Sequence, residues 1–398
     1  MKKLLKQLFV CLIISIGATN IATSQAQLLF QSGFEGTSTV VEDGGNDIGV
    51  PYERLTGIDN TLTTKNSWTT DWTGVTSNAK MQVQYTGGDA AKRFAKVVTD
   101  PTNANNKVLQ FWLNDSWVAD GGALKSRVQT NLYGIVGGFK EFYQSVRVFL
   151  PTDFNELRTY PSKITWCTLS EFWNNEWWVT NEPYGFRVSL GIGKPTAATS
   201  DLNFILNAEN AGQIEVWNGD NTNIKVPIGK WFKMDYYYKE GNAQTGRFWM
   251  SITPDGEPTK VVFDIRNFTH NTYDPAPNGV TGYNPLKLYT AKEHVSYVKA
   301  RGKTLQVYWD DYKLWKNKTP ETTPTQDITD NSDIQVQPVQ GGVDITTIKE
   351  EKYRIINLMG QVVASGNCQS GTQFVPFKGN GIYIVKVSNK PFKVFLDY

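Results

Sequence analysis

The chain has 398 residues, well above the usual length of one domain, so we expect more than one folded part. Hydrophobic residues make up 40% and aromatic residues 13%, which is enough to bury a core and excludes a disordered chain. Forty basic and 38 acidic residues leave a net charge of +2, which gives no electrostatic basis for binding nucleic acid.

Residues 1–26 have the pattern of a secretory signal peptide. Lys2, Lys3 and Lys6 form a basic start, an apolar run covers Leu8–Ile16, and Ser24-Gln25-Ala26 resembles a cleavage site. This run is shorter than the roughly 20 residues of a transmembrane helix, and no later run reaches that length. We therefore expect a secreted protein, extracellular or at the cell surface, with no membrane-spanning segment.

The cysteines and histidines are too few for a disulfide framework or a zinc site. Cys11 belongs to the signal peptide, which leaves Cys167 and Cys368, far apart in the chain. Neither has a Cys-x-x-Cys partner, and His270 and His294 are the two histidines of the chain. The usual Cys/His spacing for zinc is therefore missing.

Residues 27–318 alternate between apolar and polar positions in short runs, broken by Gly, Pro, Asn and Asp. This pattern is typical of half-buried antiparallel strands, and no long helix is predicted. We expect an all-β fold, a large β-jelly roll of the concanavalin-like two-sheet type, which would be the catalytic domain. The clearest runs are Glu141–Leu150, Tyr184–Ile192, Leu202–Asn207, Trp231–Lys239, Arg247–Ile252 and Leu305–Trp315.

Residues 319–333 are rich in Thr and Pro and predict a linker. Residues 334–398 contain further short strand-like runs separated by glycines, which predicts a small C-terminal β-sandwich.

The C-terminal part resembles the sorting domain that the type IX secretion system of Bacteroidetes recognises. The resemblance rests on YRIINLMGQVVASG (353–366) and GNGIYIVKVSNKPFKVF (379–395), with a basic final strand. It implies export through the outer membrane by the type IX machinery and removal of the tail. The alternative is a carbohydrate-binding or spacer sandwich.

Hydrolase signatures are weak in the main part of the chain. No Gly-x-Ser-x-Gly elbow accompanies a histidine, which argues against a serine hydrolase. Asp310 and Asp311 are adjacent and should point to opposite faces of a strand, whereas a retaining glycosidase needs two carboxylates flanking one bond. Glu171 and Glu176 fall in an Asn- and Trp-rich stretch that we expect to be a loop.

The same stretch concentrates aromatic residues. Trp173, Trp177, Trp178 and Tyr184 lie within residues 172–186. Flat rings beside polar groups suit stacking against sugar rings, which would make this a substrate subsite. Packing of the rings in the core is the equally open alternative.

Several polar residues interrupt apolar strands. In residues 184–192, Arg187 alternates with apolar neighbours and should point away from the core. Each such residue alone is best explained by a solvated outer face, but together they predict a concave face that binds a polysaccharide. The residues that share this pattern are Arg127, Gln129, Asn131, Arg187, Ser189, Asn203 and Asn207.

A face with cations, amides and tyrosines but no carboxylate pair suits β-elimination on an anionic polysaccharide. A cation or amide must stabilise the charge that develops on the uronate carboxylate. A base must take the adjacent ring proton, and an acid must protonate the leaving oxygen. Lys or His can serve as the base and Tyr as the acid.

Four segments resemble the ulvan lyases of polysaccharide lyase family 28. They are GGALKSRVQTNLYG (121–134), PSKITWCTLSEFWNNEWW (161–178), PYGFRVSLGIGK (183–194) and NGVTGYNPLKLYT (278–290). The resemblance implies a jelly-roll enzyme with Lys163 as the base and Tyr283 as the acid; because Tyr289 is close in the chain, one sequence does not fix the register of the acid. Arg187 is the first choice for contacting the carboxylate or sulfate, followed by Arg127 and Gln129.

A lysine base requires a pKa below its ordinary value of about 10.4. We expect burial beside Trp166 and the neighbouring arginines to lower it. A structural Ca²⁺ ion is also plausible, because related sandwiches join their first and last strands through oxygen ligands. Glu35 and Asp311 would lie at such a junction, and ordinary turn carboxylates are the alternative.

These expectations combine into a secreted, endo-acting ulvan lyase that cleaves between sulfated rhamnose and a uronic acid. The product would carry an unsaturated uronate end. The alternatives are a non-catalytic carbohydrate-binding sandwich, or a lyase of the same fold that acts on alginate or a glycosaminoglycan.

Overall fold

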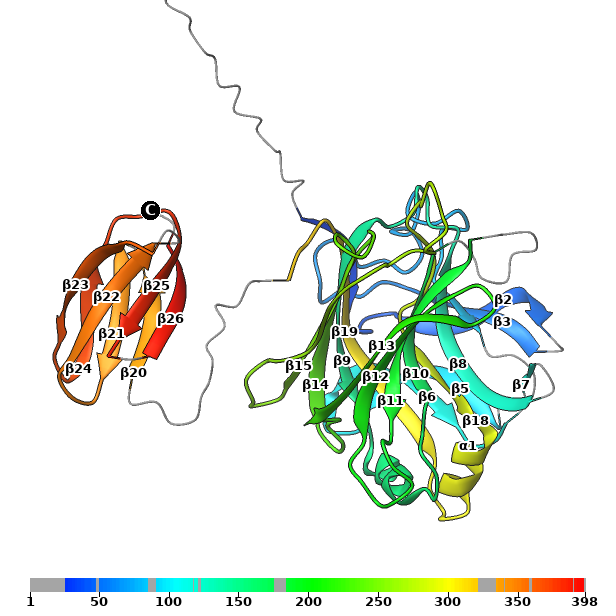
Figure 1. Cartoon of the computed structure of the whole chain (residues 1–398). Helices are drawn as coiled ribbons and strands as arrows, with labels where there is room; N and C mark the ends of the chain where they lie inside the picture. The colour runs from blue at the N-terminus through cyan, green and yellow to red at the C-terminus, as the bar shows by residue number, and fades with distance from the viewer. Residues whose placement is uncertain are drawn as a thin grey trace, which may run out of the picture. The chain divides into compact units, whose positions relative to one another are not determined.

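The computed structural model describes residues 26–396 except 48–49, 85–90, 117, 121–122, 175–183, 321–333, 340, 358–359 and 389. Most of the predicted signal peptide and linker, together with Trp177 and Trp178, lie outside the described residues. The chain divides into two compact units, Met1–Thr319 and Pro320–Tyr398 (Figure 1).

The first unit is a two-sheet β-sandwich of the jelly-roll type. The strands of its eight-stranded sheet are β1 (Gln27–Ser32), β5 (Arg93–Asp100), β6 (Asn103–Leu113), β9 (Glu141–Phe149), β14 (Trp231–Lys239), β15 (Arg247–Pro254), β16 (Lys260–Arg266) and β19 (Leu305–Lys316). Their order is β16-β15-β14-β9-β19-β6-β5, and β1 pairs with β19. The N-terminal strand therefore pairs with the last strand of the unit.

The second sheet of this unit has eleven strands. They are β2 (Thr39–Asp47), β3 (Val50–Thr56), β4 (Gln82–Gln84), β7 (Val118–Asp120), β8 (Ala123–Tyr133), β10 (Cys167–Asn174), β11 (Phe186–Gly193), β12 (Asn203–Asn210), β13 (Ile214–Lys225), β17 (Val280–Asn284) and β18 (Lys287–Ala291). The order is β13-β12-β11-β10-β17-β8-β4-β3-β2. β18 pairs with both β10 and β8, and β7 pairs with β8.

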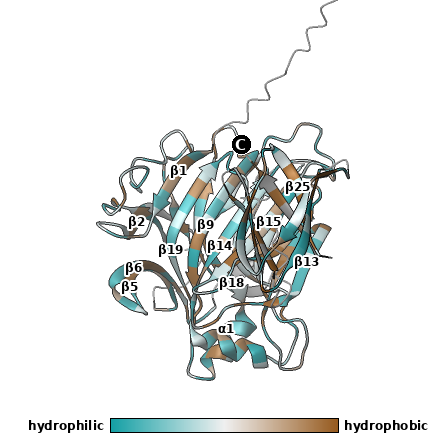
Figure 2. Cartoon of the chain, turned by 90° about the vertical axis from the view of Figure 1, so that its left-hand side faces the viewer, coloured by the Kyte–Doolittle hydropathy of each residue, from teal (hydrophilic) through white to brown (hydrophobic). Residues whose placement is uncertain are grey.

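Side chains of the two sheets interdigitate in one apolar core. On β11, Phe186, Val188 and Leu190 are fully buried, whereas Arg187 and Ser189 on the other face are partly exposed. Brown and teal segments alternate in the same way along β9 and β14 in Figure 2. The period of two in the sequence therefore corresponds to real strands, and the predicted all-β jelly roll is confirmed.

Helical structure is limited to two short elements within the described residues. The 3₁₀ helix η1 (Thr152–Thr159) and the α-helix α1 (Lys292–Lys299) pack against each other, and His294 makes an edge-on contact with Tyr160 at 4.8 Å between ring centroids. Neither has the length and apolar character that crossing a bilayer requires, within the part of the chain that the structure covers.

The second unit is a small β-sandwich of two antiparallel sheets with its own core. One sheet contains β20 (Ile334–Val339), β21 (Gly342–Thr347) and β24 (Gly371–Pro376), and the other contains β22 (Glu351–Asn357), β23 (Val362–Cys368), β25 (Gly381–Val387) and β26 (Lys390–Leu396). Cys368 is buried in this core and Cys167 in that of the first unit, and both thiols are free.

Candidate functional site

The side chains of the eleven-stranded sheet that point away from the core form a strongly polar surface, which we call the polar face. Cross-strand register places Arg127 opposite Tyr289 and Gln129 opposite Lys287, while Trp173 lies opposite Arg187. These neighbours come from β8, β18, β10 and β11, so the sheet brings together residues that are up to 162 positions apart in the chain, from Arg127 to Tyr289.

Glu171 is the centre of a charge network on the polar face. One carboxylate oxygen accepts a hydrogen bond from the ammonium of Lys287, and the other lies 3.6 Å from the guanidinium of Arg187. Arg187 also donates to Glu209 and lies 5.1 Å from the ring centroid of Trp173. One carboxylate therefore joins two cations that reach it from different strands.

The burial of this network shifts its pKa values. Burial lowers the pKa of Lys287 to about 8, although Glu171 opposes the shift. Burial by itself would raise the pKa of Glu171, but Lys287 and Arg187 outweigh it and hold that pKa below the ordinary value. At neutral pH Glu171 is therefore ionised and Lys287 is mostly protonated.

Tyr289 is the partly exposed tyrosine at the centre of three cations. Its ring centroid lies 4.8 Å from the ammonium of Lys287, 5.5 Å from the guanidinium of Arg127 and 5.8 Å from the ammonium of Lys125. Burial raises the pKa of its hydroxyl, and Lys125 and Arg127 limit the rise. Tyr289 therefore keeps its proton at neutral pH in a positively charged setting.

A layer of amides lies beside these charges. The Asn131 Oδ1 atom accepts hydrogen bonds from Gln129 at 2.7 Å and from Asn284 at 2.5 Å, and the Trp173 indole donates to Asn284 at 3.2 Å. The buried side-chain carbonyl oxygens of Gln129, Asn203 and Asn207 have no hydrogen-bond partner among the described residues. Because these oxygen atoms are buried, a sugar bound at the surface does not reach them.

Tyr283 does not lie on the polar face. Its side chain is fully buried in the core, where its ring stacks on Phe172 with centroids 5.1 Å apart. Burial raises the pKa of its hydroxyl well above the ordinary value. From this position Tyr283 cannot protonate a sugar bound at the surface, so the predicted role of acid does not fit the structure.

Lys163 is exposed in the segment between η1 and β10. It precedes Ile164, which forms an isolated bridge with Lys194, and it lies three residues before Trp166. The indole of Trp166 is 5.1 Å from the ring of Tyr289. Lys163 is therefore three residues along the chain from a side chain that contacts Tyr289.

The predicted substrate-binding residues have different positions. Arg127, Gln129 and Arg187 share the polar face around Tyr289 and Glu171. Asn203 begins β12, where it donates to Asp220 and lies opposite Gly193. Trp177 and Trp178 lie outside the described residues.

Two central residues, Glu171 and Lys287, were missed by the sequence analysis. Glu171 was assigned to a loop, but it lies in β10, between the buried residues Ser170 and Phe172. Lys287 lies between Leu286 and Leu288, both in the core. The alternation argument that was applied to Arg187 would have placed both residues on the polar face, but it could not have paired them.

The two histidines are buried away from this network. His270 Nδ1 lies 2.8 Å from the carbonyl oxygen of Asn271, and His294 Nδ1 lies 2.6 Å from the hydroxyl of Thr290. Burial lowers the pKa of His294 to about 4, so it is neutral and packs α1 onto the sheet. Neither histidine occupies the position of a base beside Tyr289.

The predicted calcium ligands, Glu35 and Asp311, line one recess of about 560 Å³. Asp310 lines it too, because β19 is irregular there and Asp311 has a φ of 49°, so the two adjacent carboxylates do not point to opposite faces as predicted. Glu35 accepts a hydrogen bond from the Lys107 amide at 2.6 Å. The oxygen donors suit Ca²⁺, but no group of three Asp, Glu, His or Cys residues in the described ranges has the spacing to hold a metal.

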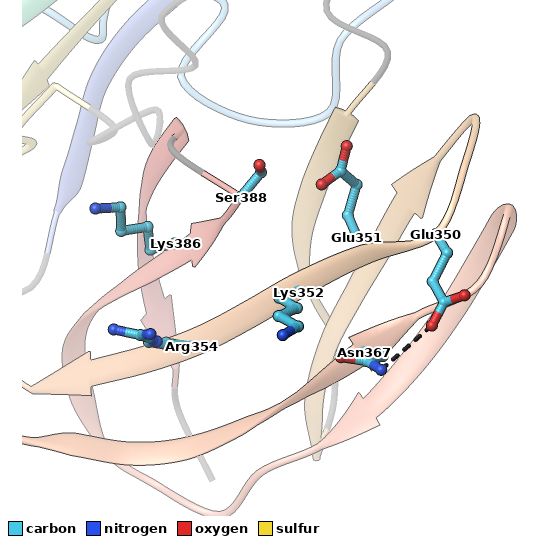
Figure 3. A pocket seen from close by; sticks show the side chains of 7 residues that line it. All are labelled: Glu350, Glu351, Lys352, Arg354, Asn367, Lys386 and Ser388. Atoms are coloured by element: carbon cyan, nitrogen blue, oxygen red, sulfur yellow. Dashed lines mark hydrogen bonds between the residues drawn. The ribbon is translucent and has the colours of Figure 1, made fainter.

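A further recess of about 500 Å³ belongs to the C-terminal unit (Figure 3). Lys352 and Arg354 of β22 and Lys386 of β25 line it, together with Glu350 and Glu351. It contains none of the residues of the polar face.

No protein-family model matches the chain, and no curated protein matches it. Among solved structures it is similar to an alginate lyase from Aplysia kurodai, with 10% identity, a TM-score of 0.35 and coverage of 56% of this chain and 87% of that one. It is also similar to the endo-β-1,4-glucuronan lyase from the fungus Trichoderma reesei, with 14% identity, a TM-score of 0.36 and coverage of 58% of this chain and 90% of that one. A third similar structure is a glycoside hydrolase family 131 catalytic domain from Coprinopsis cinerea, with 12% identity, a TM-score of 0.31 and coverage of 67% of this chain and 94% of that one. At this level of similarity neither the fold nor the activity of the present chain follows from these proteins.

Proposed function

We propose that this protein is a polysaccharide lyase that cleaves an anionic polysaccharide by β-elimination on the polar face. The observation that supports this most is the environment of Tyr289, a partly exposed tyrosine that three cations surround. Cations on this surface would attract a uronate carboxylate, and Tyr289 carries a proton that a leaving oxygen needs.

In this mechanism the substrate uronate binds near Arg127 and Arg187. Their guanidinium groups stabilise the negative charge that develops when the proton next to the carboxylate is removed. Lys163 is the proposed base on the family resemblance and on its sequence proximity to the Trp166–Tyr289 contact, although it is exposed and not buried beside Trp166 as expected. The electron pair forms the ring double bond as the glycosidic bond breaks, and Tyr289 replaces Tyr283 as the acid that protonates the leaving oxygen.

The finer assignment is to ulvan, cleaved inside the chain between sulfated rhamnose and a uronic acid. It rests on the resemblance of four sequence segments to ulvan lyases. We further propose that the N-terminal segment directs export, that the C-terminal unit is the type IX sorting domain, and that the protein acts outside the cell. A structural Ca²⁺ ion at the recess of Glu35 and Asp311 is part of the same proposal.

The decisive experiment is a screen of ulvan, alginate, glucuronan and glycosaminoglycans with the purified protein. We expect ulvan to give a rise in ultraviolet absorbance from the unsaturated uronate, with product masses that show a sulfated rhamnose at the other end. A rise in absorbance with another uronate polymer would support lyase activity but reject ulvan as the substrate. Retention of a polysaccharide without new chain ends would reject the lyase in favour of a binding protein.

A further inference from the structure

Glu171 is a carboxylate that the fold buries almost completely under a polar surface. Its side chain is 4% exposed and that of Lys287 is 3% exposed. Placing two charged groups out of water is costly, and an ion pair of this kind is often no more stable than apolar residues of similar size. A gain in stability therefore does not explain why this ion pair is buried. Its position beneath Tyr289 indicates a role in the reaction instead.

The burial of Lys287 also limits what it can do. A base must come within hydrogen-bond reach of the proton that it takes. The ammonium of Lys287 is instead bonded to Glu171 and lies against the ring of Tyr289, 4.8 Å from its centroid. Lys287 thus touches the proposed acid, whereas its low exposure keeps it from the substrate.

We propose that Glu171 is a positioning residue that keeps Lys287 charged beneath Tyr289 and orients Arg187 toward the substrate carboxylate. This inference rests on the function proposed above. Glu171 acts through its two oxygens, one for each cation, so that the charge of Lys287 and the direction of Arg187 depend on the same carboxylate. In this proposal Lys287 supplies positive charge and does not act as the base.

The charged groups around Lys287 come from four strands. Glu171 on β10 stabilises its charge, whereas Arg127 on β8 and Arg187 on β11 oppose it. Tyr289 follows on β18 itself, with Lys125 of β8 near its ring. Glu171 is the one carboxylate bonded to Lys287 among the described residues, so its removal leaves Lys287 without a bonded carboxylate, while Glu209 stays bonded to Arg187.

This arrangement predicts the pH dependence of turnover. The pKa of Lys287 is lowered to about 8, so its charge is present below that pH and is lost above it. If the charge is required, kcat/KM falls as the pH rises through about 8. If Lys287 were the base, its neutral form would be required and kcat/KM would rise over the same range. Deprotonation of the proposed base Lys163 also raises kcat/KM with pH, so the effect of Lys287 is read from the difference between the profiles of the unmodified protein and of Lys287→Arg.

The test compares pH profiles of kcat/KM for the full chain and two variants. Glu171→Gln should move the alkaline fall to lower pH by more than one unit and lower kcat/KM at pH 7 by about tenfold or more. Lys287→Arg should keep kcat/KM at pH 7 within about tenfold of the unmodified value. It should also move the alkaline fall of kcat/KM to higher pH, because a guanidinium stays charged. Asp264→Asn, which removes a carboxylate bonded to Arg247 on the opposite sheet, is the control and should leave the profile unchanged.

The proposal would be overturned if Lys287→Arg is folded but inactive and kcat/KM of the unmodified protein rises through pH 8. Should a variant fail to fold, nuclear magnetic resonance of labelled lysines in the unmodified protein gives the answer. A Lys287 that is charged at pH 7 supports the proposal, and one that is neutral at pH 7 rejects it. This measurement needs no substrate, so its failure is distinct from a failure to find lyase activity in the polysaccharide screen.

Discussion

Tyr283 and Tyr289 lie on opposite faces of the same sheet although they are only six positions apart in the chain. Tyr283, the last residue but one of β17, stacks on Phe172 in the core, and Tyr289 contacts Trp166 on the polar face. Two positions with an even separation would share a face on one continuous strand. They do not here, because β17 ends at Asn284 and β18 begins at Lys287, and the two residues between them reverse the alternation.

Tyr289→Phe should therefore abolish most of the turnover. Loss of a proton donor costs about 10²- to 10⁴-fold in rate, and we expect a fall of at least about 100-fold in kcat. The fold should persist, since the ring is kept. Ultraviolet absorbance of the unsaturated product measures the effect, and circular dichroism checks the fold.

The matched control is Tyr283→Phe. The Tyr283 hydroxyl is buried without a hydrogen-bond partner among the described residues, so its removal should raise the free energy of unfolding by about 1 kcal/mol. Turnover should change less than about twofold. If Tyr283→Phe is inactive and Tyr289→Phe retains activity, the roles of the two tyrosines must be exchanged.

Lys163→Met should remove the rise in ultraviolet absorbance while the melting temperature stays within about 2 °C. Lys163 is exposed, and substitutions at exposed positions usually change stability by less than about 0.5 kcal/mol. Lys292→Met, on the helix α1, is a suitable control of the same type. Full turnover in Lys163→Met would show that another group takes the proton.

Arg187→Ala should weaken both stability and substrate binding. It leaves Glu171 and Glu209 without a guanidinium partner, and breaking a buried ion pair costs about 3–5 kcal/mol. Because the side chain is 19% exposed, we expect a loss toward the lower end of this range. Chemical denaturation measures the loss, and titration with an oligosaccharide measures the affinity. Unchanged affinity in a folded variant would exclude Arg187 from carboxylate binding.

Asp310 and calcium can be tested together through pH. Burial raises the pKa of Asp310 to about 7, so its contribution to stability is complete below the ordinary pKa near 4 and is lost as the pH rises through 7. Asp310→Asn should flatten that decline. If Ca²⁺ binds beside Asp311, its addition at pH 8 should raise the melting temperature, and a chelator should lower it. Identical melting with calcium and with chelator would exclude the metal.

The sequence alone determined the fold class and the direction of many side chains. Alternation with period two is a local property of a strand, so Arg187 and Arg127 could be assigned to a face from their immediate neighbours. Local patterns also located the segment that contains Tyr289, without fixing which tyrosine of that segment is reachable.

Only the tertiary structure decided which of these residues meet. Glu171 and Lys287 are 116 positions apart and touch because β10 and β18 pair, and strand order is set by packing of the whole sheet. The irregularity in β19 likewise directs the side chains of both Asp310 and Asp311 toward the same recess. Burial and pairing depend on residues that are distant in the chain, and a local pattern carries no information about them.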